Sequence, residues 1–540
     1  MSADGKKVIS LKGVSKIREQ VGARKAEERD KFSSGGGAPP VTSKFVLECL
    51  KANELGDGAL YTALHRGRYC YNASGKEWMV WAGHHWELDV LGAHVAGVED
   101  VALRYLQELI PLGEQLAQAT ADGDQGRIRE ISELQKSICA RVSRLRSTRG
   151  RSGCLNFVAE SKDSLGVRGE AFDANIWLFP CANGVLDLRT GVIHAGRPED
   201  YMVKASPVEF HGIEADRSLW VQTLLEIYDG DAELVSFLQR LFGFAMTGLS
   251  SPAVFPVFHG KGRNGKSLIF DVIMSILGPM AAPIQSELFL DQGKGASRNP
   301  SAPSPEIMAL KGLRLAVGSE TDDGRKVSAA RVKWLTGSDK LVGRNPNDKY
   351  QVSFPPTHTV ALLTNHRPQA PADDFAFWER ALLIFHSISF VDREPKAANE
   401  RRADPTLKDR IMATLPGILG WMVEGCLIFQ REGLSPPRSV TEDTAKYQSE
   451  EDFLGQFLAD RCVLGQSHEV GSSVLYDEFK AWWLEQMSAN EKTVPSQRRF
   501  GKWIGARFDK QKSGKFKYFG LRLKTEDELK AESGEGGQGS

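Results

Sequence analysis

The chain has 540 residues, 41% of them hydrophobic and 26% charged, with 69 basic residues against 69 acidic ones. The zero net charge excludes a global attraction to nucleic acid or membranes, and the lack of an apolar run of about 18 residues excludes a membrane-spanning helix. Seven scattered cysteines without a C-x-x-C pair suggest neither a disulfide framework nor a zinc ribbon, and favour a reducing cytoplasm.

The length predicts about three or four domains, flanked by polar tails. Residues 1–42 are rich in Lys, Arg and Glu and end in a Ser-Gly-Pro run, so we expect a disordered tail. The acidic and glycine-rich residues 525–540 are expected to be disordered for the same reason.

Residues 43–205 predict an N-terminal domain of mixed α/β type. The aromatic-rich stretch 69–88 contains two turn signals and predicts a hairpin. Apolar residues at helical spacing over 98–149 predict helices, with a break near Pro111. A short strand between two turns is expected within 183–191.

The rest of the chain predicts four further regions. Apolar stripes indicate helices over 206–250, which we expect to serve oligomerisation. An α/β core is expected over 251–392, followed by a helical region and linker over 393–448. Residues 449–524 predict helices followed by a basic hairpin.

Residues 260–267 read G-K-G-R-N-G-K-S and match the phosphate-binding loop pattern G-x-x-x-x-G-K-[ST] in full. An apolar run at 253–258 predicts a strand before it, and 268–277 predicts a helix after it. The glycines let backbone N–H groups face phosphate oxygens, next to a helix N-terminus. We therefore expect a nucleoside triphosphate site rather than a glycine-rich turn with a solvated lysine. Its expected members are Gly260, Gly262, Asn264, Gly265, Lys266 for the outer phosphates, and Ser267 for Mg²⁺.

Three later segments place polar side chains at strand ends. Glu320 ends the apolar run 313–320, and Asn365 ends the apolar run 359–365. Arg380 precedes a third apolar run. Taken singly, these residues are equally compatible with a surface Glu, a turn-forming Asn and a surface Arg. In this order after a phosphate-binding loop they are typical of an AAA+ ATPase, in which a carboxylate activates water and an arginine acts across a subunit interface.

Seven motifs in order carry a family resemblance: N-G-V-L-D-L-R-T-G at 183–191, F-L-Q-R-L-F-G-F-A-M-T-G at 237–248, G-K-G-R-N-G-K-S at 260–267, L-R-L-A-V-G-S-E at 313–320, K-W-L-T-G-S-D-K-L-V-G-R at 333–344, A-L-L-T-N-H-R-P at 361–368 and D-D-F-A-F-W-E-R at 373–380. With them the chain resembles the superfamily 3 helicases, specifically the phage, plasmid and poxvirus primase-helicase type. The resemblance covers about 180 to 395, and extends more weakly to a C-terminal winged-helix module over 449–524.

This resemblance implies an α/β fold with an AAA+ P-loop ATPase core, assembled as a hexameric ring that hydrolyses ATP with Mg²⁺ while translocating on DNA. By position, Lys266 and Ser267 bind phosphate and Mg²⁺, and Glu320 activates water and helps to hold the metal. The resemblance makes Asn365 the sensor and Arg380 the arginine finger.

Two departures from the family pattern stand out. Ser319 occupies the position where many relatives carry a first acidic residue, so the metal would depend more on Ser267 and water. Many relatives also carry a primase domain, but no zinc cluster is present here. If 86–89 is a strand, Glu87 and Asp89 share one face, although such a pair is usually a solvated edge.

Two basic segments are candidates for contact with DNA. A hairpin is expected over 341–352, and in this superfamily such a hairpin points into the channel of the ring. Over 498–524, ten basic residues oppose one acidic residue and alternate with aromatics, which suits phosphate contacts. The expected DNA contacts are Lys340, Arg344, Lys349, Arg498, Arg499, Lys512, Lys515 and Lys517. The alternative is a solvated surface hairpin over 341–352 and a solvated basic face over 498–524.

The expected function is an ATP-dependent replicative DNA helicase of a phage, plasmid or mobile element. Its expected partners are single-stranded DNA in the channel, duplex or origin DNA at the winged helix, further copies of the chain and a replication protein, with no membrane. An AAA+ ATPase that remodels protein partners, a primase-helicase with an unrecognised priming domain and a phosphate-transferring kinase are the alternatives. DNA-stimulated ATPase activity separates the first of these from the helicase, and ring formation separates the kinase.

Overall fold

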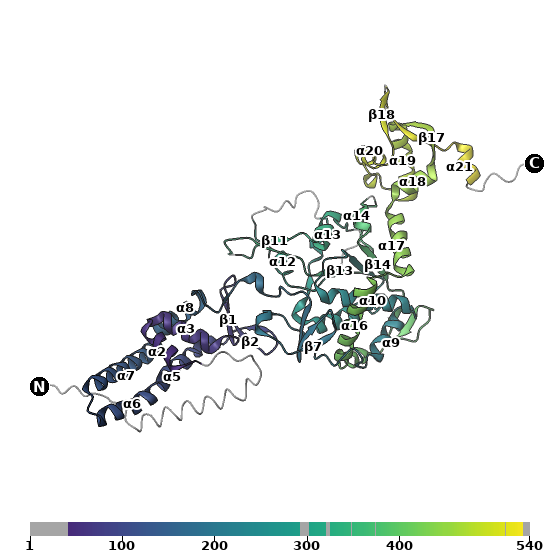
Figure 1. The fold of residues 1–540 in the computed structure, drawn as a ribbon. Helices are drawn as coiled ribbons and strands as arrows, with labels where there is room; N and C mark the ends of the chain where they lie inside the picture. Colours follow the sequence, from purple (N-terminus) through teal and green to yellow (C-terminus); the bar gives the residue numbers. More distant parts are fainter. Residues whose placement is uncertain are drawn as a thin grey trace, which may run out of the picture.

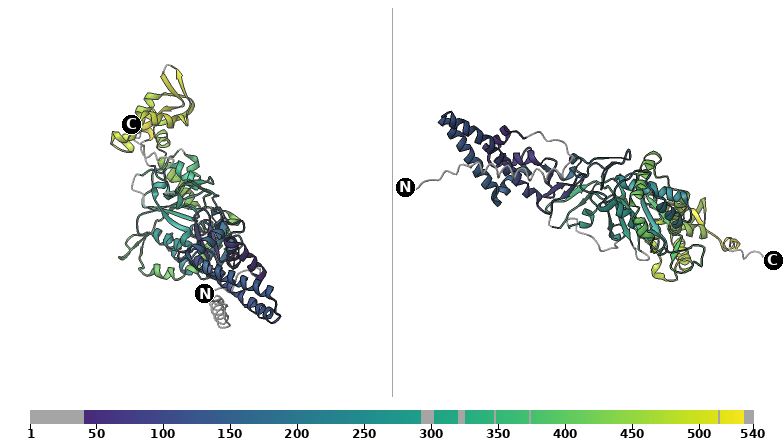
Figure 2. Two further views of the ribbon diagram at one scale, coloured as in Figure 1. Left: turned by 90° about the vertical axis from the view of Figure 1, so that its left-hand side faces the viewer. Right: turned by 90° about the horizontal axis from the view of Figure 1, so that it is seen from below.

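The computed structural model describes residues 41–291, 302–319, 325–346, 348–372, 374–513 and 515–532. The chain forms an elongated molecule, with N-terminal helices at one end, a sheet-based core in the middle and a small C-terminal unit at the other end (Figures 1 and 2). The expected disordered tail lies outside the described residues as far as residue 40.

The N-terminal end is a helical bundle around one hydrophobic cluster that includes Val46, Tyr61 and Ile138. We expected a helix break near Pro111, but the break falls at Glu108, because proline is tolerated in the first turn of the following helix. The helices are α2 (Ser43–Lys51), α3 (Asn53–His65), α4 (Ala93–Ala96), α5 (Val98–Gln107), α6 (Leu109–Ala121), α7 (Gln125–Leu145) and α8 (Thr148–Glu160).

Two small sheets connect this bundle to the core. The expected hairpin is present in the sheet of order β3-β2-β1-β4, and the expected short strand is β6 in the sheet of order β5-β6-β7. The strands are β1 (Tyr69–Asn72), β2 (Glu77–Trp81), β3 (Trp86–Leu88), β4 (Gly166–Val167), β5 (Leu178–Cys181), β6 (Gly184–Asp187) and β7 (Val192–His194).

The second of these sheets packs on the core rather than on the N-terminal bundle. Phe179, Leu186 and Leu188 belong to the large cluster of the core. The Leu188 carbonyl also accepts a hydrogen bond from Gln430 Nε2 at 2.8 Å. The region 43–205 that we expected to be one domain is therefore divided among several hydrophobic clusters. The cluster of the core takes part of it because Phe179 of β5 and Leu186 of β6 are buried against helices from much later in the sequence.

The helices after this sheet are α9 (Ser218–Ile227) and α10 (Ala232–Thr247). Helix α10 is buried on almost every face and packs closely on α16 (Leu415–Glu432). An added Cβ at Gly243 would lie 2.2 Å from the Cys426 backbone nitrogen, so glycine is required for this approach. The apolar residues of α10 are buried against other parts of the same chain. The expected oligomerisation role of 206–250 stays a prediction.

The core is a five-stranded parallel sheet of order β14-β8-β13-β10-β9. Its central strands alternate between two clusters, with Phe258 and Leu363 on one face and Val257 and Leu362 on the other. Both faces are thus covered, which is typical of parallel sheets and confirms the α/β class. The strands are β8 (Phe255–His259), β9 (Ala281–Ile284), β10 (Leu315–Ser319), β13 (Thr359–Thr364) and β14 (Ala381–Phe385).

Shorter elements surround this sheet. A two-stranded hairpin of β11 (Leu341–Gly343) and β12 (Val352–Phe354) confirms the hairpin expected over 341–352. The other elements are α11 (Lys266–Leu277), α12 (Pro305–Met308), α13 (Ala329–Thr336), α14 (Phe375–Trp378), β15 (Ser389–Val391), β16 (Glu400–Arg402) and α15 (Leu407–Met412).

The C-terminal unit follows helix α17 (Arg438–Glu451) and has its own hydrophobic cluster, which contains Phe457, Phe479 and Tyr518. Its strands form a sheet of order β17-β19-β18. The elements are α18 (Phe453–Arg461), β17 (Cys462–Gly471), α19 (Ser472–Gln486), α20 (Gln497–Gly505), β18 (Lys510–Ser513) and β19 (Lys515–Leu523).

The tail that we expected to be disordered from residue 525 begins with a helix, α21 (Glu526–Glu532). Thr525 and Glu528 form a capping box, in which Glu528 Oε2 accepts from the Thr525 nitrogen at 2.8 Å and Thr525 Oγ1 accepts from the Glu528 nitrogen at 3.4 Å. The ion pair of Arg522 with Glu528, at 2.7 Å, ties this helix to β19. The acidic composition of this segment does not show the capping box or the ion pair, so it did not predict the helix. Residues 533–540 lie outside the described residues.

Candidate nucleotide and nucleic-acid sites

The predicted phosphate-binding loop joins β8 to α11. Gly260 and Gly265 have φ values of 144° and 83°, and an added Cβ would lie 2.5 Å from the His386 carbonyl oxygen and 2.6 Å from Ile227 Cδ1, respectively. Both positions therefore require glycine for conformation and for space. An added Cβ at Gly262 would meet no described atom within 4 Å, so this glycine leaves the outer side of the loop open.

Lys266 is the first residue of α11 and folds back over the loop. Its Nζ donates to the Gly260 carbonyl oxygen at 2.5 Å and to Asn264 Oδ1 at 3.0 Å. The residue is only 7% exposed, and this burial lowers the pKa of the amine to about 8. The loop thus holds an ammonium group in a place where an incoming phosphate would compensate for its lost hydration.

Asn264 is the buried centre of the loop. Its Nδ2 is buried from solvent and has no hydrogen-bond partner among the residues that the structure describes. An unpaired buried amide donor is costly, and an oxyanion inside the loop would satisfy it. This unsatisfied donor and the open side at Gly262 both fit a bound phosphate.

A buried hydrogen-bond chain fixes the loop from below, and the sequence did not reveal it. His386 Nδ1 lies 3.1 Å from the Asn264 carbonyl oxygen, and its Nε2 lies 3.0 Å from the Tyr228 hydroxyl. Complete burial lowers the pKa of His386 to about 3, so the ring is neutral. A neutral ring can donate from Nδ1 and accept from the tyrosine at Nε2. His386 and Tyr228 belong to no motif, and His386 lies 122 residues from Asn264 and 158 residues from Tyr228, so no local pattern marks them.

The carboxyl edge of the sheet brings the loop beside two of the predicted strand ends. Thr364 pairs with His259, and Ser319 pairs with Leu363. Asn365 therefore follows the strand next to the loop, and its side chain is exposed there. Glu320 lies outside the described residues, so its position stays a prediction. Ser267 is exposed in the first turn of α11.

Arg380 lies at the opposite edge of the sheet from the loop. It directly precedes β14, whose first residue Ala381 pairs with Phe255 at the start of β8. Its Nη1 donates to the Ala376 carbonyl oxygen at 2.5 Å, and its Nε is buried without a partner in the described parts of the chain. This arginine is not brought to the phosphate-binding loop of its own chain.

His259 is a further residue at the site that the motif did not include. It is the last residue of β8, and its ring stacks on Phe385 with centroids 4.8 Å apart. Burial, and then the positive charges of Arg367 and Lys266, lower its pKa to about 4. Its Nε2 is buried with no partner among the described residues, so it is a second neutral polar group at this edge.

The pair of carboxylates considered for priming does not form. β3 ends at Leu88, and the Asp89 carboxylate instead accepts from the backbone nitrogens of Ala93 and His94 at 2.9 and 2.8 Å. The same carboxylate lies 2.6 Å from His94 Nδ1. Asp89 therefore caps α4 and is not one of two carboxylates on a strand face.

The β11–β12 hairpin carries three of the predicted DNA contacts. Lys340 and Lys349 are exposed, and neither has an acidic partner in the portion of the chain described here. Arg344 instead supports the turn, because its Nη1 donates to the Asp348 carbonyl oxygen at 2.8 Å. Tyr350 beside them is 80% exposed. The two lysines are thus the free charges of this hairpin.

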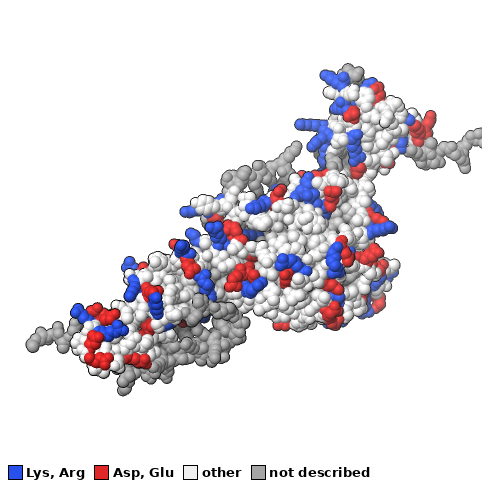
Figure 3. Space-filling model, viewed as in Figure 1, with Lys and Arg blue, Asp and Glu red and all other residues white. Residues whose placement is uncertain are grey.

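The C-terminal unit carries the remaining predicted contacts, and Lys and Arg gather on one side of it (Figure 3). Lys517 is paired with Glu469 at 2.5 Å, so its charge is balanced. The side chain of Lys515 lies outside the described part of the chain. Arg498 and Lys512 are exposed without an acidic partner among the described residues.

Arg499 makes a cation–π contact within its own helix, and its expected contact with DNA stays a prediction. Its guanidinium stacks over the Trp503 ring at 4.8 Å from the centroid, on the same helix.

Among the described residues, no group of His, Cys, Asp and Glu could hold a metal ion. Across the same residues, no helix is long and apolar enough to cross a membrane.

Comparisons with known proteins find a matching family and viral relatives. The family described as "D5 N terminal like" matches residues 59–229. A candidate helicase of Acanthamoeba polyphaga mimivirus is 25% identical over 324 residues, covering 58% of this chain and 33% of the viral protein. A candidate helicase of Frog virus 3 is 23% identical over 388 residues, covering 58% of this chain and 39% of that protein.

The resemblance to superfamily 3 helicases of the primase-helicase type is confirmed. A candidate helicase of Sputnik virophage is also 25% identical, over 143 residues that cover 26% of this chain and 18% of that protein. The chain therefore spans well under half the length of these viral relatives. An apo structure of the NrS-1 C-terminal region matches with a TM-score of 0.34 and 15% identity, covering 55% of this chain and 63% of that one.

Proposed function

We propose that this protein is an ATP-dependent DNA helicase that acts as a homo-oligomeric ring, with a hexamer as the expected form, in the replication of a viral, plasmid or mobile-element genome. The observation that carries the proposal is the placement of the loop around Lys266 beside Asn365 at one edge of the sheet, with Arg380 at the other. With β8 counted first, the order β14-β8-β13-β10-β9 becomes 5-1-4-3-2, the order of an AAA+ core. This order supports the finer fold assignment.

Within one subunit, the loop binds and orients the triphosphate. Lys266 and the Asn264 amide donate to phosphate oxygens, and backbone N–H groups at the start of α11 add further donors. Ser267 directly, and Glu320 through water, would hold Mg²⁺, which would supply positive charge beside the phosphates. Glu320 orients the attacking water, and Asn365 donates to the terminal phosphate while accepting from that water.

Arg380 completes the site of a neighbouring subunit. Two subunits related by rotation in a ring present opposite edges of their sheets to each other, which suits a group remote from its own loop. Its unpaired Nε supports this role, since a phosphate oxygen across the interface would satisfy it. Hydrolysis would then depend on contact between subunits.

DNA is engaged at two places in this proposal. Lys340 and Lys349 on the β11–β12 hairpin track phosphates of one strand in the channel. The element order of the C-terminal unit, helix-strand-helix-helix-strand-strand, is that of a winged helix, with α20 as the helix that approaches DNA. Arg498 and Lys512 supply phosphate contacts there.

The decisive experiment measures ATP hydrolysis with and without single-stranded DNA, together with unwinding of a forked duplex. A helicase gives hydrolysis that rises with DNA and unwinding that requires ATP. Hydrolysis indifferent to DNA, with a protein substrate that changes state instead, would identify the remodelling ATPase. Primer synthesis by the purified chain would establish the primase-helicase alternative, for which the Asp89 cap provides no support.

A further inference from the structure

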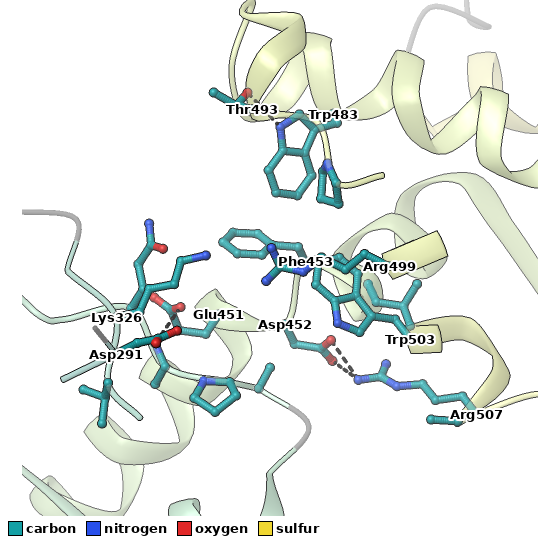
Figure 4. Close-up of a pocket in the computed structure, with 18 residues that line it drawn as sticks. Asp291, Lys326, Glu451, Asp452, Phe453, Trp483, Thr493, Arg499, Trp503 and Arg507 are labelled. Carbon is teal, nitrogen blue, oxygen red and sulfur yellow. Dashed lines mark hydrogen bonds and ion pairs between the residues drawn. The ribbon is translucent and has the colours of Figure 1, made fainter. Parts of the chain in front are cut away.

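A cavity of 630 Å³ lies between the core and the C-terminal unit (Figure 4). Lys326 and Glu451 line it from the core side. Phe453, Trp483 and Arg499 line it from the C-terminal side. None of these residues belongs to the phosphate-binding loop or to the sheet edge that carries Asn365. The cavity is therefore separate from the nucleotide site.

Two cations from the two sides face this cavity. Burial lowers the pKa of Lys326, and the positive charge of Arg499 lowers it further, while Asp291 and Glu451 oppose the shift. Neither cation has a carboxylate within ion-pair distance among the described residues. Figure 4 shows the Lys326 amine and the Arg499 guanidinium both directed at the space beside Phe453. Two like charges that converge without a bridging anion are a binding site for an anion.

The carboxylates at the rim are partly engaged by the protein. Glu451 Oε2 accepts from the Ala370 backbone nitrogen at 3.1 Å. Both carboxylate oxygens of Asp452 accept from Arg507 Nη2 at 2.8 Å, and one of them also accepts from the Gly455 nitrogen at 2.9 Å. Asp291 and Glu451 attract Lys326 through space, but neither forms an ion pair with Lys326 or Arg499 among the described residues, so these two cations have no direct carboxylate partner.

Aromatic rings form the apolar wall next to these cations. Phe453 packs edge-to-face on Trp483, with centroids 5.2 Å apart. The Trp483 Nε1 group donates to Thr493 Oγ1 at 3.3 Å, which holds the indole in place. Trp503 lines the opposite side beneath Arg499. Rings held rigidly beside unpaired cations are the combination that binds the bases and backbone of a single polynucleotide strand.

We propose that this cavity holds one nucleotide of a single DNA strand, with a backbone phosphate between Lys326 and Arg499 and a base against Phe453. The proposal rests on the proposed function and deepens it, because it routes the strand between the core and the C-terminal unit. Arg498 continues the same basic helix outside the cavity, where it can contact the neighbouring phosphate. The strand would then bind both units at once.

Lys326→Gln is the most discriminating variant, because this cation comes from the core and would not contribute to an interface confined to the C-terminal unit. Binding is measured by fluorescence anisotropy of a fluorescein-labelled oligothymidylate over a range of salt. We expect affinity to fall ~10-fold and the salt slope to fall by about one, the effect of one lost phosphate contact. Lys311→Gln, at an exposed core lysine away from the cavity, should leave both unchanged.

Photocrosslinking of the wild-type chain provides a readout that does not depend on the folding of a variant. An oligonucleotide containing 5-iododeoxyuridine, irradiated in complex with the full chain, should crosslink to Phe453 or Trp483, as mapped by mass spectrometry. Phe453→Leu keeps the apolar volume and should lose the crosslink at that position. The proposal would be overturned if Lys326→Gln bound oligothymidylate as tightly as Lys311→Gln does and crosslinks formed only outside the cavity.

The failure of this inference differs from failure of the proposed function. If Lys326→Gln kept normal DNA-stimulated hydrolysis and unchanged DNA affinity, DNA binding in the cavity would be rejected and the helicase function would be retained. Crosslinks in the cavity of a protein whose hydrolysis ignores DNA would support the cavity and reject the helicase. If Lys326→Gln lost binding to a polyglutamate peptide but not to oligothymidylate, the occupant would be a protein segment and the proposal would be wrong.

Discussion

Lys266 places a buried amine in the candidate nucleotide site. Its amine is held between a backbone carbonyl and the Asn264 side chain, away from bulk water. The cost of this burial appears as the lowered pKa, and it is recovered when an oxyanion arrives. The site is therefore arranged for a ligand with negative charge before that ligand binds.

Replacing this amine should stop catalysis without unfolding the chain. We expect Lys266→Ala to lower the rate of ATP hydrolysis by ~10²-fold or more, because charge on the transferred phosphoryl group is left uncompensated. A steady-state ATPase assay measures this, and thermal unfolding checks the fold. Lys261→Ala, at an exposed lysine of the same loop, is the matched control and should retain the activity. Equal activity in the two variants would contradict the assignment.

The lowered pKa also predicts the pH dependence of nucleotide binding. Lys266 is charged below a pH of about 8 and neutral above it, and phosphate binds the charged form. Affinity for a non-hydrolysable ATP analogue should therefore be highest below this pH and fall by up to ~10-fold per unit above it. Titrations between about pH 7 and pH 9.5 would measure the effect. Lys266→Arg stays charged over this range and should flatten the profile, and a wild-type profile that is equally flat would refute the explanation.

At the scale of elements, the packing of α10 on α16 supports the site from behind. Gly243 of α10 and Gly425 of α16 let the two helices approach, and an added Cβ at Gly425 would lie 2.0 Å from the Gln239 carbonyl oxygen. The same cluster contains Ile269 and Ile273 of α11, the helix that begins at Lys266. Helix packing therefore positions the phosphate-binding loop.

A glycine-to-alanine pair tests this packing. Gly243→Ala should destabilise the fold by about 1–3 kcal/mol, because the new methyl group meets backbone atoms that cannot yield. Gly113→Ala in α6 meets no described atom within 4 Å and should stabilise its helix by about 0.5–1 kcal/mol. Chemical denaturation measures both changes. Equal stability of the two variants would show that the close approach of α10 and α16 is not required.

A second arrangement of elements connects the sheet edge beside Asn365 to the C-terminal unit. Arg367, two residues after Asn365, pairs with Glu450 of α17 at 2.6 Å and lies over the Tyr447 ring. Tyr447 also donates a hydrogen bond to the Pro368 carbonyl oxygen. Helix α17 continues into α18 after a single residue. A displacement of the segment after Asn365 would therefore reach the C-terminal unit through one helix.

At the scale of the whole molecule, the sheet separates two halves of a composite site. The loop lies at the carboxyl edge, and Arg380 lies at the amino edge. No rearrangement of side chains within one subunit can bring them together, because the length of β8 lies between them. The proposed activity is consequently a property of the assembly.

Mixing experiments test this assembly. Arg380→Ala should bind an ATP analogue with unchanged affinity but hydrolyse ATP ~10³-fold more slowly, the usual effect of losing an arginine finger. Mixing it with Lys266→Ala should restore part of the activity, because each variant supplies what the other lacks at mixed interfaces. Hydrolysis per subunit should also rise with protein concentration. Full activity of Arg380→Ala, at all concentrations, would exclude action across an interface.

Local patterns in the sequence were sufficient to predict the phosphate-binding loop, its flanking strand and helix, and the strands that end beside Ser319 and Asn365. Glycine geometry, alternation of apolar residues and helix starts depend on neighbours in the chain, so they can be inferred without tertiary contacts. The domain limits and the roles of Glu320, Asn365 and Arg380 stay predictions. Glu320 lies outside the described residues, and the roles of Asn365 and Arg380 depend on a bound nucleotide and on a second subunit.

Only the tertiary structure revealed the chain from Asn264 through His386 to Tyr228, the neutralisation of Lys517 by Glu469, and the cavity between Lys326 and Arg499. Each depends on residues far apart in the sequence, whose proximity is decided by how helices and strands pack. The sequence does not show which residue will pair with a charged side chain or a histidine. Burial and pairing determine whether such a side chain binds a ligand or supports the fold.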